Sequence, residues 1–159
     1  MNKHPERGMK LAALAAALVG LLAAFVFLPM LASALLEEFP AYQKWYWPCL
    51  IYGWVVLLPG FAGLWEFWKI CVEIGRDNTF SEVNARGLVR ISRLMGTACA
   101  LMAVGLAVLL FGRGQPEPVL EGLTALGALI ALVLALFASA MAQLIRAGAA
   151  LKDENDLTI

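Results

Sequence analysis

The sequence has few charged residues and almost no histidine or cysteine. Charged side chains make up 15% of the 159 residues, against roughly 25% in a typical soluble domain. The one histidine, His4, stands beside the N-terminus, which argues against a haem with axial histidine and against a Ser-His-Asp triad. The three cysteines lie on separate segments and form no Cys-x-x-Cys pair, so a disulfide exchanger is not expected.

Net charge and motifs narrow the function classes further. Twelve basic residues balance twelve acidic ones, so the sequence predicts no positive field for direct binding of nucleic acid. No glycine-rich phosphate loop occurs, and no nucleophile has a base beside it. We therefore expect a protein that is not an enzyme and that has no cofactor and no metal site.

Four long runs without charge dominate what is present. Hydrophobic residues make up 62% of the chain. A helix needs about 20 apolar residues to cross roughly 30 Å of hydrocarbon, and it pairs its own backbone polar groups there. The third run has only 18 residues and is expected to borrow a turn from its flanks. The prediction is an all-α integral membrane four-helix bundle, a single domain over residues 1–159, with these spans: Leu11–Leu36, Trp45–Trp65, Leu94–Phe111 and Leu123–Ile145.

The basic residues predict the orientation. Ten of them lie in residues 1–10, 66–93 and 146–159, whereas the two remaining loops hold only Lys44 and Arg113. The positive-inside rule then places both termini, the loop 66–93 and the tail 146–159 in the cytoplasm, with the four spans in the plasma membrane. The N-terminal run resembles a signal peptide but exceeds the roughly 7–15 residues of a signal core, so we expect it to be retained.

The predicted spans carry no carboxylate and no histidine. Small residues recur in each at helical spacing and predict close helix packing, either within the bundle or, for one stripe, between copies in a homo-oligomer. The stripes are Ala16, Gly20 and Ala24; Gly53, Gly60 and Gly63; Gly96, Ala100, Ala103 and Ala107; and Gly127, Ala131, Ala135 and Ala142.

Glu66 is the carboxylate nearest to a predicted span. Lys69 and Glu73 follow it at i+3 and i+7, on the same helix face. This spacing favours an interfacial ion-pair ladder. The alternative is a buried ligand site at Glu66.

The loop before the third span contains a helix start. Thr79-Phe80-Ser81-Glu82 fits a capping box with Thr79 as N-cap and Glu82 reaching back, and Ser81 is the alternative N-cap. We expect the helix to run unbroken from there into the membrane. Arg86, Arg90 and Arg93 then share one face, and Glu82 can pair with Arg86. Those arginines lie either among anionic headgroups of membrane lipid or against an acidic partner.

The sequence of the tail, residues 146–159, predicts that this segment docks on another surface. The fourth helix is expected to continue past Arg146 and to fray near Asp153. Acidic residues there alternate with apolar ones, which suggests that the tail docks on the arginine face or on a partner. The residues concerned are Leu151, Asp153, Glu154, Asp156, Leu157 and Ile159.

Two segments of the chain resemble a known family. Phe80-Ser81-Glu82-Val83-Asn84 and the terminal Glu154-Asn155-Asp156-Leu157-Thr158-Ile159 are similar to those of the YoaS-like family of small four-span bacterial membrane proteins of uncharacterised function. Thr79 departs from the proline or similar turn residue that is common before this motif. The resemblance implies no enzymatic activity. Because the family's genes often neighbour a Cro/CI-type helix-turn-helix regulator, it implies a membrane partner for such a protein.

Two functional hypotheses follow from the sequence and the resemblance. The first is a signalling or sequestration partner that binds the soluble regulator on a cytoplasmic platform. The second is a transporter, or a protein that protects against lipophilic compounds or peptides, in which Glu66 takes part. The platform residues of the first hypothesis are Phe80, Asn84, Arg86, Arg90, Arg93, Asp153, Glu154, Asn155, Asp156, Leu157 and Ile159.

Overall fold

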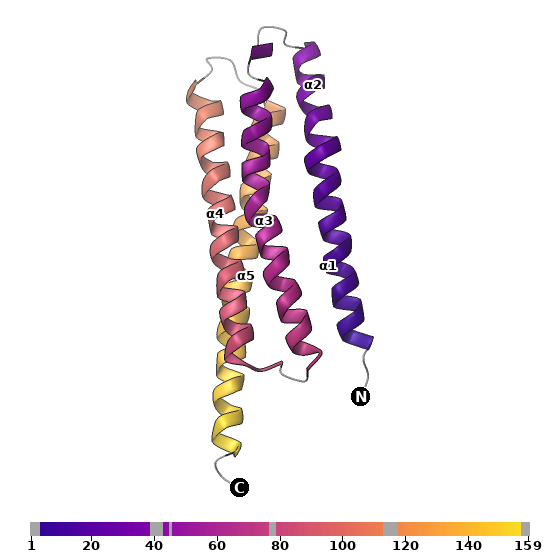
Figure 1. The fold of residues 1–159 in the computed structure, drawn as a ribbon. Coiled ribbons are helices and arrows are strands. Elements are labelled where there is room, and N and C mark those ends of the chain that lie inside the picture. Colours follow the sequence, from indigo (N-terminus) through magenta and orange to yellow (C-terminus); the bar gives the residue numbers. More distant parts are fainter. Residues whose placement is uncertain (1–3, 39–42, 45, 77–78, 113–117, 157–159) are drawn as a thin grey trace.

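The protein is a set of long, nearly parallel helices (Figure 1). The computed structural model describes residues 4–38, 43–44, 46–76, 79–112 and 118–156. The first transmembrane helix consists of α1 (His4–Leu22), a π-helical turn η1 (Ala23–Phe27) and α2 (Leu28–Glu38). It is followed by α3 (Tyr46–Ile74), α4 (Glu82–Gly112) and α5 (Pro118–Asp156).

The four predicted spans are confirmed as helices long and apolar enough to cross a membrane. The candidate spans are Arg7–Ala34, Tyr46–Ile74, Glu82–Phe111 and Pro118–Leu151. The third predicted run of 18 residues is extended, as expected, because α4 begins at Glu82 and continues without a break. The fourth helix passes Arg146, also as expected, and reaches Asp156.

Both termini lie at one end of the molecule (Figure 1). Three parts of the chain lie at this end: the start of α1, the turn between α3 and α4, and the end of α5. We call this the basic end, because it carries the loop arginines and Arg146. At 1.5 Å per residue, the 39 residues of α5 span about 58 Å. The last turns of α5 therefore extend past the α3–α4 turn, as Figure 1 shows.

The helices pack in chain order and do not close into a bundle. The first helix packs on α3, α3 on α4, and α4 on α5. Within the described ranges, no Cα atom of the first helix comes within 8 Å of α4 or α5, and α5 comes that close to α4 alone. The four helices are those predicted, and the prediction of a four-helix bundle did not specify that the first and fourth are not in contact. Alanine explains the tightest contact, since buried Ala98 on α4 and buried Ala131, Ala135 and Ala142 on α5 bring those two backbones together.

The third small-residue stripe does not take part in this packing. Gly96, Ala100, Ala103 and Ala107 are all exposed on α4. α4 instead meets α3 on another face, where the Tyr52 ring lies over Gly105 so closely that a Cβ atom there would overlap the phenol oxygen. For these four residues the structure contradicts packing within the bundle. The homo-oligomer interpretation of the same stripe stays a prediction.

One hydrogen bond from a side chain to a backbone carbonyl joins each pair of neighbouring helices. In hydrocarbon such a bond has no competition from water. The three bonds run from the Tyr52 hydroxyl on α3 to the Leu101 carbonyl on α4, from the Ser92 hydroxyl on α4 to the Ala135 carbonyl on α5 (2.8 Å), and from the Trp54 indole on α3 to the Ala24 carbonyl on η1 (2.9 Å).

Pro29 accounts for the π-helical turn and its contact with Trp54. In η1 the N–H of Leu28 donates to Ala23 instead of Ala24. The next donor in this π register is residue 29, which is proline and has no N–H. The Ala24 carbonyl, on a residue only 4% exposed, thus loses its helical donor and accepts the Trp54 indole N–H instead.

Replacing Trp54 by phenylalanine is expected to destabilise the protein by about 1 kcal/mol. The substitution leaves an aromatic ring at this position, but the Ala24 carbonyl loses the indole N–H donor. The measurement is the free energy of unfolding in detergent. The matched control is Trp47→Phe, since Trp47 is 63% exposed at the start of α3. Equal stability of the two variants would contradict the role given to the indole.

Candidate functional site at the basic end

Two hydrogen bonds donated by Asn84 stabilise the start of α4 and the turn before it. Ser81 is the N-cap, because its hydroxyl accepts the backbone N–H of Asn84 (3.3 Å) and the helix begins at Glu82. The Asn84 amide Nδ2 returns to donate to the Thr79 carbonyl (3.0 Å). The prediction of Thr79 as N-cap is therefore wrong, and the alternative, Ser81, is confirmed. Asn84 occupies the N3 position that glutamate takes in the usual capping box.

This capping explains the Phe-Ser-x-x-Asn segment as a structural unit. Asn84 is only 1% exposed, so its side chain lies in the interior and holds the turn. Phe80, in contrast, is 55% exposed. Its ring rests on α5, where a Cβ atom added to Gly148 would lie 2.7 Å from the Phe80 Cδ1 atom. The absence of a side chain at Gly148 thus gives Phe80 its place.

An ion pair joins Glu82, at the start of α4, to α5. Its carboxylate lies 3.4 Å from the Arg146 Nε, with both side chains about half exposed. The predicted pairing of Glu82 with Arg86 through the carboxylate is wrong, because the Arg86 Nε donates to the Glu82 backbone carbonyl (3.3 Å). An exposed ion pair contributes little stability, so the Glu82–Arg146 contact mainly sets the register of α5 against the turn.

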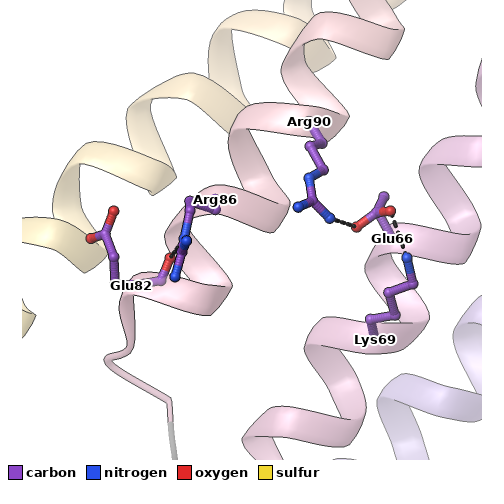
Figure 2. A network of polar contacts seen from close by, with 5 residues as sticks. All are labelled: Glu66, Lys69, Glu82, Arg86 and Arg90. Atoms are coloured by element: carbon purple, nitrogen blue, oxygen red, sulfur yellow. Dashed lines mark hydrogen bonds and ion pairs between the residues drawn. The ribbon is translucent and has the colours of Figure 1, made fainter.

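The three predicted arginines have different surroundings. Arg90 lies 3.4 Å from the Glu66 carboxylate on α3, and Lys69 lies 2.7 Å from the same group; Figure 2 shows both converging on it. The ion-pair interpretation of Glu66 is thus confirmed for Lys69, and the partner from α4 is an addition that the sequence did not predict. Arg86 and Arg93 are exposed.

The acidic tail is described only in part. Asp153, Glu154, Asn155 and Asp156 belong to the last turn of α5. Leu157 and Ile159 lie outside the described residues, so docking of the tail stays a prediction.

Sequence reasoning missed two features of this site. The Arg90–Glu66 pair joins residues 24 positions apart, and only the packing of α3 on α4 brings them together. Gly148 was not identified either, although a glycine among alanines late in a helix signals a close approach. In the part of the chain that the structure describes, no three His, Cys, Asp or Glu side chains come close enough to hold a metal ion.

Comparison with known proteins gives the family. A family model described as a protein of unknown function (DUF2975) matches residues 30–159. The chain belongs to this family. It is also 30% identical over 148 residues to the "Uncharacterized membrane protein YoaS" of Bacillus subtilis (strain 168), with 89% of each chain covered. No solved structure matches.

The comparisons confirm the YoaS-like resemblance that the two sequence segments suggested. The family match includes the capped turn and the whole of α3, α4 and α5, and it leaves out α1 and η1. The protein is a multi-pass membrane protein with four candidate spans.

Removing the cap should loosen the start of α4. Ser81→Ala is expected to destabilise the protein by about 1 kcal/mol and to speed hydrogen exchange at residues 82–85, since the Asn84 N–H loses its acceptor. Thr97→Ala is the control, because the Thr97 hydroxyl donates only to the Arg93 carbonyl of its own helix. Unchanged exchange at residues 82–85 in Ser81→Ala would show that Ser81 is not the cap that the geometry indicates.

Proposed function

We propose that the protein is a membrane-anchored docking partner that binds a soluble cytoplasmic protein at its basic end. The single observation that carries this proposal is Phe80. Phe80 is 55% exposed and lies in the turn before α4, outside the candidate spans. Its ring packs against Gly148 of α5. An anchored aromatic side chain that faces solvent is the usual centre of a protein interface.

The surroundings of Phe80 suit a partner with both apolar and charged groups. α5 continues past the contact of Phe80 with Gly148, and its last residues include the acidic Asp153, Glu154 and Asp156. Arg86 and Arg93 contribute exposed positive charge on α4, whereas Arg90 is paired with Glu66. We therefore retain Phe80, Arg86, Arg93 and the end of α5 in the platform. Asn84 positions Phe80 from inside.

The proposed occupant is the helix-turn-helix regulator of the Cro/CI type that the family resemblance implies. Binding at the membrane would lower the regulator's free concentration near DNA. The proposal requires the basic end to face the cytoplasm, which the distribution of Lys and Arg supports. The transport hypothesis has less support, since the cavity beside Glu66 lies at the end of α3 and not at mid-span.

The test is binding of a purified helix-turn-helix regulator of the Cro/CI type to the full chain in detergent. Phe80→Ser, Gly148→Leu and a chain ending at residue 152 are each expected to weaken binding at least about tenfold, because they remove or displace the centre or flank of the platform. Phe111→Ser is the matched control: this phenylalanine is 86% exposed at the opposite end of α4.

Two outcomes would reject the proposal. One is the absence of any binding to the wild-type chain. The other is wild-type affinity in both Phe80→Ser and Gly148→Leu, with all chains folded by circular dichroism.

A further inference from the structure

A cavity of about 320 Å³ lies between the last turns of α3 and the first turns of α4. Its charged lining consists of Glu66, Lys69, Glu73, Arg86 and Arg90. Ile70, Val83 and Gly87 supply the apolar part. The Ile70 side chain and Gly87 touch so closely that the two helices are in contact on one side of the cavity.

The charges around the cavity do not cancel. Three cations and two carboxylates line it, which leaves one positive charge in excess. Glu66 is engaged by Lys69 and Arg90, and Glu73 contacts Arg76 at 3.6 Å. Arg86 differs from these, because no carboxylate of the described residues pairs with it and its Nε donates to a backbone carbonyl (Figure 2). Among the cations that line the cavity, Arg86 is therefore the one that no carboxylate of the described residues pairs with.

The aromatic residues next to the cavity indicate its depth in the bilayer. Trp65 and Trp68 lie on α3 within the turn that leads to Lys69. Tryptophan prefers the level of the lipid headgroups, where its apolar ring and polar edge are both accommodated. Lys10 stacks on Trp68 at 5.8 Å and Lys69 on Trp65 at 5.9 Å, as expected where cations meet the membrane surface. The cavity thus lies where the phosphate groups of a bilayer are found.

We propose that this cavity binds the phosphodiester of one phospholipid headgroup. A phosphodiester carries a single negative charge, which the Arg86 guanidinium can balance. Arginine donates two parallel N–H groups to phosphate oxygens, and the terminal nitrogens of Arg86 supply such a pair. The acyl chains then extend toward the hydrocarbon, in the direction in which α4 continues past Arg90. This site does not depend on the proposed function, since lipid binding is measured without a protein partner.

The experiment is native mass spectrometry of the full chain, delipidated in a neutral detergent and titrated with phosphatidylglycerol. Wild-type protein is expected to bind one lipid tightly. Arg86→Gln should weaken this binding about tenfold, and Arg86→Lys should weaken it less, because charge is kept while the two-pronged donation is lost. Arg7→Gln removes the same charge from an exposed position on α1 at the same end and should leave the affinity unchanged.

Two ligands tested on the wild-type chain identify what is recognised. Diacylglycerol with the same acyl chains lacks the phosphate and should bind at least about tenfold more weakly. Inorganic phosphate should not displace the lipid at equal concentration. Equal affinity for diacylglycerol would overturn the proposal in favour of apolar contact alone, and full displacement by phosphate would overturn it in favour of a free-anion site. Wild-type affinity in Arg86→Gln would overturn it as well.

Discussion

Every polar group buried in lipid needs a hydrogen-bond partner, and this constraint explains how the helices are held together. No water competes for polar groups in the hydrocarbon region. Trp54, Tyr52 and Ser92 each donate across a helix interface to a backbone carbonyl, one bond for each pair of neighbouring helices. Apart from the ion pairs Arg90–Glu66 and Glu82–Arg146 at the basic end, the described helix contacts are mainly apolar. Large side chains such as Leu18, Phe25 and Leu136 face outward. Against hydrocarbon, apolar surface gives no preference between lipid and protein, so small residues and these bonds select the pairs that form.

The polar chemistry of the described residues gathers at the basic end. There Ser81 and Asn84 fix a turn that presents Phe80, while Gly148 makes room for its ring. Further along α4, Glu66 and Arg90 join α3 to α4 beside a cavity with an unbalanced charge. The turn is suited to binding a protein and the cavity to binding a lipid, so the two proposals assign different ligands to surfaces that share Arg86.

The sequence was sufficient for the elements but not for their arrangement. Charge-free length predicted the four spans, and Ser81 was already one of two candidate caps. The choice between Thr79 and Ser81 depended on which hydroxyl accepts the Asn84 backbone N–H, which periodicity does not encode. Pairs such as Arg90 with Glu66, and the exposure of the stripe beginning at Gly96, depend on how each helix is rotated against its neighbour. Hydropathy contains little information on that rotation, because in lipid most faces of a helix are apolar.

The chain-order packing has a further consequence for how the molecule comes apart. The first helix is attached along a single seam, to α3, whereas α4 is enclosed on two sides. Loss of the first helix would remove only its contact with α3. The contacts of α3 with α4 and of α4 with α5 would remain. The family match, which starts at residue 30, includes this inner unit and only the end of the outer helix. We therefore expect the N-terminal helix to separate from the rest more easily than α4 and α5 separate from each other.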